Sequence, residues 1–350
     1  MTNVRIESLE SVGEEWRSLS ARLESTPFHS VDWASAWWAA FGRGKPKVLT
    51  ARRGSELVGV LPMVERGGKL VSPTNWHTVV NGPLAEDSGV VSDLYREMAA
   101  LGARHIDLAF LGDSDMTVAL RELDSAGYRT ERRVIQRSPY LTVSGEWEPY
   151  WSSRSRNLRG AIRRCRNRLS DLGEVRISVS SGAEELDTQL AEGFAIEGSG
   201  WKDERGTAIA SRPETLDFYR AIARYAADAG TLRLAFLRID GRAAAFNLSL
   251  ESGGHHYLIK LGHDPELNQA GPGTVLTAAM VERAFELRLK TYEFLGAADS
   301  YKLRWTDQCH DRHRVQAFSS TLSGRVDRFI QTRGRSFARR LLRRPPAVSL

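Results

Sequence analysis

The segment from residue 255 to 306 carries the side chains whose order most clearly indicates chemistry. A strand-like run at 255–262 leads into Asn268-Gln-Ala-Gly271-Pro272-Gly273, and a helix is predicted to begin at once with Thr274. The two glycines let another group approach the backbone closely, and the proline fixes a turn. Because the N–H groups at a helix start attract anions, the spacing predicts a pyrophosphate site at Gly271–Thr274, preceded by Asn268.

Polar side chains also follow the next predicted strand, at residues 291–295. Tyr301 and Lys302 lie just beyond its C-terminal end, close to Trp305. Lys302 suits a phosphate or an acceptor carboxylate, and the alternative is an ordinary surface lysine. The Tyr301 hydroxyl could donate a proton to a reacting group. The alternative is a packed ring whose hydroxyl bonds a backbone carbonyl.

Glu197 is the candidate for proton transfer. It follows a predicted helix at 183–195 and precedes Gly198-Ser199-Gly200, so we expect it at a flexible edge. A carboxylate there could act as a general base, whereas a solvated glutamate is the usual alternative. Further side chains are candidates for contact with a substrate: Trp201, Lys202, Asp264 and Trp305.

The positive charge of the chain is concentrated in two arginine-rich blocks. The net charge is +6 over 350 residues, but seven arginines lie within 154–168 and eight within 325–344. Apolar residues of the first block share one side of a predicted helix, so its arginines form the opposite face. Arginine favours phosphate and carboxylate partners, which indicates tRNA or an anionic membrane surface as a partner of either block. A solvated helix face and a solubilising tail are the alternatives.

Composition excludes several classes of protein. Two cysteines, Cys165 and Cys309, cannot form a disulfide framework or a cysteine-rich zinc site. His310 and His313 have no second pair of ligands near them, so we expect no metal. No run approaches the roughly 20 apolar residues of a membrane span, and residues 1–20 do not resemble a signal peptide. We therefore expect a cytoplasmic protein, with peripheral attachment to the inner membrane face as a variant.

The predicted elements fit an α/β (α+β) fold. Each half of the chain shows helices, an antiparallel meander, a helix and a further strand, which indicates two tandem domains with mixed, mostly antiparallel sheets. We expect an N-terminal domain at 1–150, a C-terminal domain at 151–322 and an Arg-rich helix or tail at 323–350. Trp33 and Trp37 share a face of a predicted helix at 32–41 and are expected in the core. The remaining helices are expected at 12–23, 90–101, 116–126, 213–229 and 274–287, and the strands at 47–53, 57–64, 105–111, 134–143, 175–179, 231–239, 242–250 and 255–262.

The order strand, glycine loop, helix, strand and tyrosine resembles the GCN5-related N-acetyltransferases (GNAT). Their loop signature is Gln/Arg-x-x-Gly-x-Gly/Ala, and here Asn268 replaces the first residue. Other motifs resemble the BioF2-like or CelD-type branch of that superfamily, which is distantly similar to FemX-like aminoacyltransferases. These motifs are Glu197-x-x-x-Trp201-Lys202-x-x-x-Gly206, Phe218-Tyr219, Leu295-Gly296…Tyr301-Lys302-x-x-Trp305, Ser155-Arg-Asn-Leu-Arg159, Trp33-x-x-x-Trp37 and Gly59-x-x-Pro62.

This resemblance implies an acyl-CoA-dependent N-acyltransferase without a metal. Acetyl-CoA would bind at Asn268 and Gly271–Thr274 of the C-terminal domain, and an amine of a small molecule, sugar or peptide would attack its thioester. Tyr301 would protonate the leaving thiolate, and backbone N–H groups of 256–262 would polarise the thioester carbonyl. Two alternatives stay open: a FemX-like aminoacyltransferase that uses aminoacyl-tRNA, and a non-catalytic module of this fold in envelope or polysaccharide assembly.

Overall fold

The computed structural model describes residues 2–182, 184–199 and 209–331. Its chain divides into two compact units. The first unit takes residues 1–23, 43–135 and 312–350, and the second takes 24–42 and 136–311. This division differs from the predicted boundaries at 150/151 and 322/323, because each unit combines segments that are distant in sequence.

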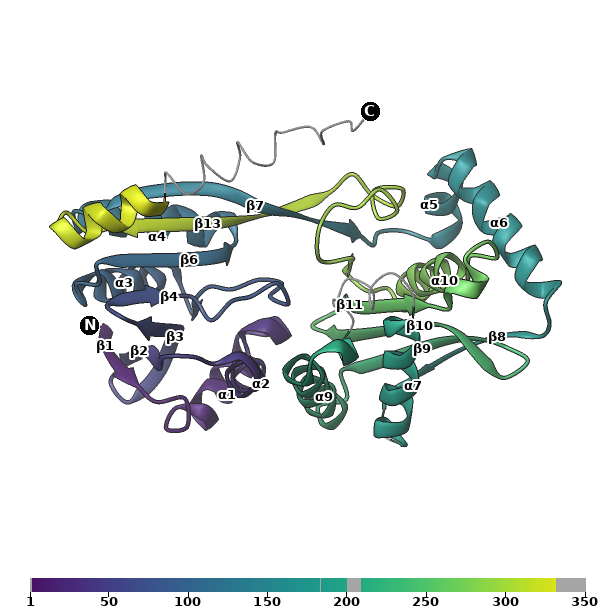
Figure 1. Cartoon of the computed structure of the whole chain (residues 1–350), viewed down its shortest axis with the longest axis horizontal. Helices are drawn as coiled ribbons and strands as arrows, with labels where there is room; N and C mark the ends of the chain where they lie inside the picture. Colours follow the sequence, from purple (N-terminus) through teal and green to yellow (C-terminus); the bar gives the residue numbers. More distant parts are fainter. Residues whose placement is uncertain (1, 183, 200–208, 332–350) are drawn as a thin grey trace, which may run out of the picture. The chain divides into compact units, whose positions relative to one another are not determined.

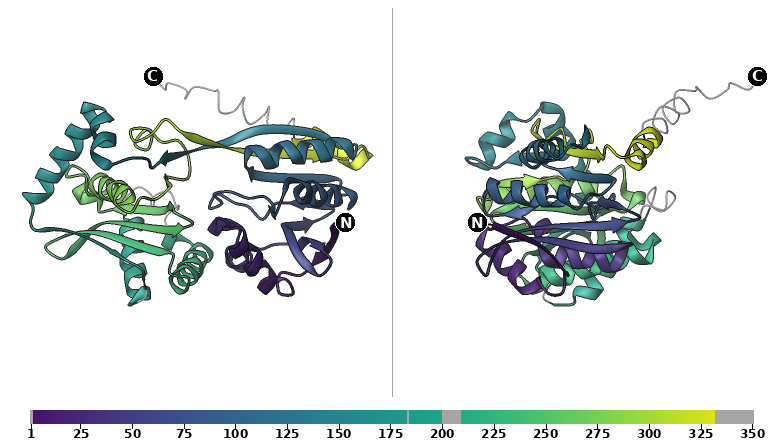
Figure 2. Two further views of the ribbon diagram at one scale, coloured as in Figure 1. Left: turned by 180° about the vertical axis from the view of Figure 1, so that it is seen from behind. Right: turned by 90° about the vertical axis from the view of Figure 1, so that its left-hand side faces the viewer.

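The first unit is a mixed sheet with helices packed on it. Its strands are β1 (Thr2–Glu7), β2 (Lys45–Arg53), β3 (Glu56–Arg66), β4 (Lys69–Val71), β5 (Leu84–Ala85), β6 (His105–Leu111) and most of β13 (Cys309–Phe318). Its helices are α1 (Gly13–Arg22), α3 (Ser88–Ala100), α4 (Asp113–Ser125) and a helix at 322–331. The strand order is β1-β2-β3-β4-β6-β13, and only β4 and β6 pair in parallel. Helices α3 and α4 lie side by side over this sheet (Figure 2) and bury Leu94, Met98 and Leu123 in its core.

The second unit repeats this plan. Its strands are β7 (Arg129–Thr142, which enters from the first unit), β8 (Val175–Ser180), β9 (Leu232–Ile239), β10 (Arg242–Ser252), β11 (His255–His263) and β12 (Thr291–Glu293). Its helices are α2 (Val31–Phe41), α5 (Trp147–Ser153), α6 (Arg156–Ser170), α7 (Leu186–Gly198), α9 (Pro213–Asp228) and α10 (Pro272–Glu286), with short 3₁₀ turns at Pro27–His29, Ile209–Ser211 and Pro265–Leu267. The order is β7-β12-β11-β10-β9-β8, and only β11 and β12 are parallel.

Helices cover both faces of the second sheet (Figure 1). Leu276 and Val281 of α10 pack with Ala245 of β10 on one face. Phe246, the next residue of β10, therefore points to the other face, where it meets Phe194 of α7. The α/β (α+β) prediction with mostly antiparallel sheets flanked by helices is confirmed. No helix in the described part of the chain is both long and apolar enough to cross a membrane.

Local sequence signals place most elements correctly. The side chain of Ser30 accepts a hydrogen bond from the Trp33 amide and begins α2, and Ser155 does the same for Leu158 at the start of α6. Asp240 and Gly241 turn β9 into β10, as the Asp-Gly pair predicts.

The aromatic helix α2 belongs to the second unit, although it lies in the predicted N-terminal domain. The rings of Trp33 and Phe218 of α9 meet edge to face at 5.3 Å, and Phe28 meets Tyr257 at 5.2 Å. Both Trp33 and Trp37 are buried, which confirms the expectation that they are core residues. These contacts explain why residues 24–42 fold with residues 136–311.

Strand β13 was not predicted, because the residues after 306 read as a polar stretch outside the core. In the structure Val315, Ala317 and Phe318 are buried, and the strand pairs with β6. Arg314 forms a two-pronged ion pair with Asp107 on β6, which accounts for an arginine within a central strand.

Candidate functional site

The start of α10 is built as an open helix N-terminus. Gly271, the residue before the helix, has φ +70° and ψ +46°, a left-handed conformation that favours glycine. A Cβ on Gly271 would lie 2.6 Å from Sγ of Cys165, and one on Gly273 would lie 3.3 Å from Nδ1 of His263. Within the described residues no side chain caps this helix. Pro272 has no N–H, and the Thr274 and Val275 amides donate to the Gly271 carbonyl oxygen, so the Gly273 N–H is the donor that this helix start offers to an anion.

A cavity of about 740 Å³ opens beside this helix start. It lies within the second unit and is lined by the end of α7, the end of β11, the loop and first turn of α10, and residues 299–305. Among the predicted site residues, the lining includes Glu197, Asn268, Gly271, Gly273, Thr274, Tyr301 and Trp305. The structure therefore brings the predicted anion site, the candidate base and the candidate acid to one cavity.

The sheet of the second unit splits next to this cavity. The parallel pairing of β11 with β12 covers only residues 255–257 and 291–293. Beyond it, residues 258–261 of β11 and residues 294–296 line a smaller cavity of about 160 Å³. Leu261 and Tyr301 line both cavities, so the edge of β11 leads directly into the larger one.

Tyr301 stands where the two cavities meet. Its side chain is partly exposed, with 38% of its surface accessible. Partial burial, together with the neighbouring Asp299 carboxylate, holds the pKa of the Tyr301 hydroxyl well above the usual value of a phenol. The hydroxyl therefore keeps its proton at neutral pH, although the raised pKa also makes it a weaker acid.

Lys302 is buried below the turn that carries Tyr301. Its Nζ donates to the carbonyl oxygens of Leu295 at 2.8 Å and Ala297 at 2.9 Å, and lies 3.0 Å from Oδ2 of Asp299. Burial lowers the pKa of Lys302, against the effect of Asp299. An ammonium group has three N–H donors, and three acceptors surround that of Lys302. The geometry therefore favours a role for Lys302 in positioning the loop and not in binding a phosphate.

We expected Glu197 at a flexible edge. The structure instead places it in the last turn of α7, with 1% of its surface exposed. Its Oε2 accepts a hydrogen bond from the Ile209 amide at 2.9 Å. Helix α7 approaches β11 so closely that a Cβ on Gly262 would lie 2.5 Å from Cα of Glu197. Gly262 thus sets the position of this carboxylate against the strand, a function that local sequence patterns did not reveal.

The other predicted contacts divide into two groups. Oδ1 of Asn268 lies 2.5 Å from Nε2 of His263 at the cavity wall, and the Trp305 side chain is buried against the cavity. Asp264, by contrast, accepts from Arg242 at 2.6 Å and from the Glu266 amide at 3.0 Å, which turns its carboxylate to the start of a 3₁₀ turn. Trp201 and Lys202 lie outside the described residues.

Helix α6 supports the loop before α10. Nη1 of Arg168 donates to the carbonyl oxygen of Gln269 at 2.7 Å, and Cys165 packs against Gly271. Arg154, which lies just before α6, supports a different loop: it donates to the carbonyl oxygen of Trp305 at 2.7 Å, after the turn that carries Tyr301. The role of these arginines as loop supports was not predicted, because it depends on carbonyl groups about 100 residues or more away in the sequence.

The model of the Acetyltransferase (GNAT) domain family matches residues 156–303. This stretch is a GNAT domain. It runs from the arginine-rich helix α6 through the glycine turn to the loop that carries Tyr301, and it supports acyl transfer as the general activity. No curated protein matches the sequence significantly.

Several solved structures resemble this chain over most of its length, beyond the residues that the family model matches. The C-terminal domain of a protein described as a lysylphosphatidylglycerol synthetase from Agrobacterium fabrum is 12% identical, with a TM-score of 0.57 over 93% of this chain and 97% of that one. FemX is 13% identical, with a TM-score of 0.57 over 89% and 96%. A protein of unknown function from Bacteroides thetaiotaomicron is 10% identical, with a TM-score of 0.54 over 91% and 100%. At such identities the likeness shows the fold alone, and it confirms the predicted fold class.

The first unit contains an element order like that of the GNAT domain, but its helix start differs. Helix α3 joins the parallel strands β4 and β6 as α10 joins β11 and β12. Oδ1 of Asp87 accepts from the Val90 amide at 3.0 Å and so caps α3 with a carboxylate. A negative charge at this position opposes a phosphate, which makes α10 the better anion site of the two.

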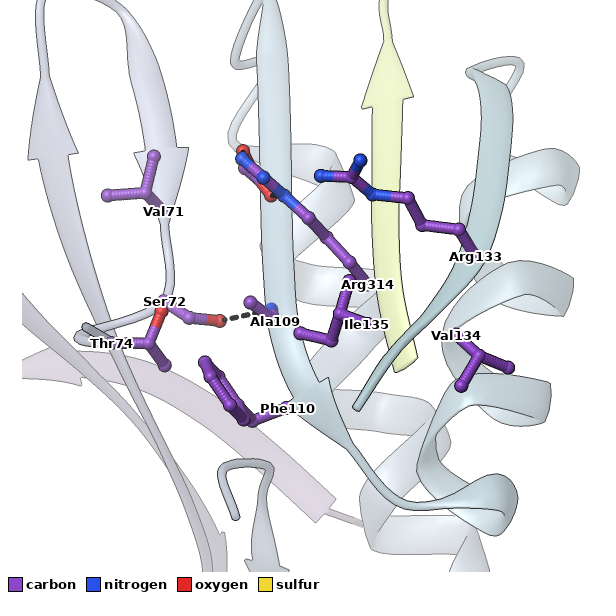
Figure 3. A pocket seen from close by; sticks show the side chains of 10 residues that line it. Val71, Ser72, Thr74, Ala109, Phe110, Arg133, Val134, Ile135 and Arg314 are labelled. Atoms are coloured by element: carbon purple, nitrogen blue, oxygen red, sulfur yellow. Dashed lines mark hydrogen bonds and ion pairs between the residues drawn. The ribbon is translucent and has the colours of Figure 1, made fainter. Parts of the chain in front are cut away.

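A cavity of about 670 Å³ lies where β4 and β6 of the first unit part. Figure 3 shows Ser72, Thr74 and Phe110 on one side and Arg314 and Arg133 on the other, with the Ser72 hydroxyl accepting from the Ala109 amide at 3.3 Å. The Arg314 guanidinium pairs with Asp107 here, so its charge is already compensated.

His310 and His313, the two histidines nearest to Cys309 and Asp311, both contact other side chains. His310 stacks on Tyr140 at 3.9 Å, and Nε2 of His313 lies 2.7 Å from Oδ1 of Asp113. Across the part of the chain that the structure describes, no three His, Cys, Asp or Glu side chains form a group that could hold a metal ion.

Proposed function

We propose that the second unit is an acyl-CoA-dependent N-acyltransferase that moves an acetyl group from acetyl-CoA to an amine. The observation that carries this proposal is the uncapped glycine turn at Gly271–Gly273, which opens on the same cavity as Tyr301 and Glu197. An anion site, a protonated phenol and a carboxylate around one cavity are what transfer from a thioester to an amine requires.

The donor would bind along the glycine turn and the split in the sheet. Its pyrophosphate would accept from the Gly273 N–H and lie at the positive end of α10, beside Thr274. Its thioester arm would lie beside residues 258–261 of β11, where the parallel pairing has ended and a second cavity begins. The carbonyl would then stand near Leu261 and Tyr301, where the two cavities meet.

The reaction would be direct attack of the acceptor nitrogen on the thioester carbon. The new C–N bond forms, the C–S bond breaks, and the nitrogen loses a proton while the sulfur gains one. Glu197 is the proposed base, directly or through water, and Tyr301 the proposed acid. Lys302 would act as a positioning residue that holds the loop of Tyr301.

The acceptor is proposed to be an amine of a small molecule, sugar or peptide. Trp201 and Lys202 stay proposed acceptor contacts. Asp264 is no longer a candidate, because Arg242 and the Glu266 amide bind its carboxylate.

Calorimetric titration with acetyl-CoA tests the donor site. Gly273→Val places a branched side chain at the second residue of α10, where even a Cβ lies 3.3 Å from His263, and should weaken binding by at least about tenfold. Gly89→Val is the matched control, because Gly89 is the second residue of α3 in the first unit. Equal loss in both variants, or no binding by the wild type, would remove the proposal.

A second candidate is transfer from aminoacyl-tRNA, and the face of α6 favours it. Arg156, Arg163 and Arg164 are exposed and have no side-chain partner among residues 2–182, 184–199 and 209–331. If they bind RNA, affinity for tRNA should fall steeply with salt, and Arg→Gln at these three positions should reduce that salt dependence. Acetyl-CoA binding without tRNA binding would exclude this candidate.

A further inference from the structure

The helix at 322–331 (yellow in Figures 1 and 2) turns an apolar face to solvent. Leu322 is 80% exposed, Val326 57%, Phe329 53% and Ile330 60%. The spacing i, i+4, i+7, i+8 places all four on one side of the helix. Surface helices of globular proteins normally bury such a stripe, so this face is suited to a surface outside the protein.

The polar side of the same helix faces the first unit. Asp327 is buried, and its carboxylate lies 3.2 Å from Nζ of Lys69 and 3.1 Å from Nε of Arg104. Nε of Arg328 lies 3.1 Å from Oε1 of Glu131. These ion pairs hold the helix in an orientation that is the reverse of the usual one, with its charged side inward and its apolar side outward.

The charge of this region is strongly positive. Residues 325–350 contain eight arginines and one acidic residue, Asp327. Asp327 is paired with Lys69 and Arg104, and of the two arginines that the structure describes here, Arg325 is exposed. An exposed apolar stripe in a helix that an arginine-rich sequence follows is the pattern of helices that lie in the surface of an anionic bilayer.

We propose that the helix at 322–331 docks the protein on an anionic lipid surface, with Leu322, Val326 and Ile330 inserted among the acyl chains and Arg325 on the headgroups. A nucleic acid would match the charge but would leave the apolar stripe in water. A second copy of this chain would cover the stripe but would bring two arginine-rich segments together. The bilayer alone satisfies both features, and this inference is independent of the proposed acyl transfer.

Vesicle co-sedimentation of the full chain tests the inference. Binding to vesicles of equimolar phosphatidylcholine and phosphatidylglycerol should exceed binding to pure phosphatidylcholine and should weaken with salt. The variant L322S/V326S/I330S removes three apolar side chains without a change in charge and should lower the partition coefficient at least about tenfold. The matched control is L101S/L172S/L287S, three leucines that are 42%, 52% and 50% exposed elsewhere, and it should bind like the wild type.

Three results would overturn the inference. One is equal vesicle binding by the stripe variant and the wild type. Another is a dimer, seen by light scattering, that the stripe variant alone dissociates, since the stripe would then be a self-association surface. The third is binding to an RNA oligonucleotide that the stripe variant alone loses, since the stripe would then face a nucleic acid. Circular dichroism of both triple variants separates a loss of binding from a loss of folding.

Discussion

At the scale of single residues, the site depends on a glycine that no other residue can replace without strain. Gly271→Ala meets two costs, a left-handed φ of +70° and a Cβ 2.6 Å from Sγ of Cys165. Gly230 has nearly the same φ, +69°, but a Cβ there would meet nothing within 4 Å. Gly230→Ala should therefore cost about 1 kcal/mol of unfolding free energy, and Gly271→Ala clearly more.

Urea unfolding of both variants measures this difference. Cys165→Ala should restore part of the loss in the double variant with Gly271→Ala, because it removes the sulfur that the new methyl group meets. If Gly271→Ala and Gly230→Ala lower the free energy of unfolding equally, then α6 does not approach the loop as closely as the structure shows.

Tyr301 is predicted to act in the chemical step alone. Tyr301→Phe should lower kcat for acetyl transfer by about a hundredfold and leave the Kd of acetyl-CoA unchanged. Because burial and Asp299 raise the pKa of the hydroxyl, the phenol stays protonated, and Tyr301 should cause no fall of kcat between about pH 7 and pH 9.

Tyr292→Phe is the control for this variant. Its buried hydroxyl has no hydrogen-bond partner within the described part of the chain, so its loss should leave kcat as it is. A Tyr301→Phe enzyme with full kcat would assign the proton donation to another group.

At the scale of elements, a buried ion cluster joins three strands and a helix of the second unit. Glu251 of β10 accepts hydrogen bonds from Arg233 of β9, His256 of β11 and Arg283 of α10. Burial alone would raise the pKa of Glu251, but the bonds from His256 and Arg283 outweigh it and bring the pKa to about 2, from the usual 4.5. The cluster should therefore contribute to stability mainly when Glu251 is ionised.

The sign of the pH dependence follows from this lowered pKa. The contribution, about 3 kcal/mol at most, is present above pH 4.5 and is lost as the pH falls toward 2. Glu251→Gln should be less stable than the wild type at neutral pH and should show a smaller loss below pH 4.5. Exposed Glu286→Gln is the control in the same urea titrations, and an equal acid loss in Glu251→Gln and the wild type would contradict the cluster's role.

Elements that depend on local signals could be predicted, and elements that depend on distant pairing could not. The glycine turn before α10, the Ser30 and Ser155 caps and the Asp240-Gly241 hairpin are each encoded within a few residues. Strand β13 is polar in sequence and becomes a central strand only because Asp107, about 200 residues earlier, neutralises Arg314. The buried place of Lys302 likewise depends on carbonyl groups of a loop that sequence alone does not shape.

At the scale of the whole molecule, neighbouring segments of the chain do not always belong to the same unit. Residues 24–42 lie between two segments of the first unit, yet Trp33 packs on Phe218 and Phe28 on Tyr257 of the second. A prediction of domains from contiguous stretches could not find this exchange, because the signal is complementarity between aromatic residues about 200 positions apart.

The exchange has a measurable consequence. Trp33→Ala empties a buried indole site in the second unit and should cost about 3–5 kcal/mol there. Hydrogen exchange followed by mass spectrometry should then show faster exchange in α9 and β11, with β2 and β3 little changed. Trp16→Ala is the counterpart, because Trp16 is buried in α1 of the first unit, and it should speed exchange in β3 and leave α9 unchanged. If Trp33→Ala instead quickens exchange in β2 and β3, then residues 24–42 fold with the first unit, and the boundary belongs where a contiguous reading of the chain puts it.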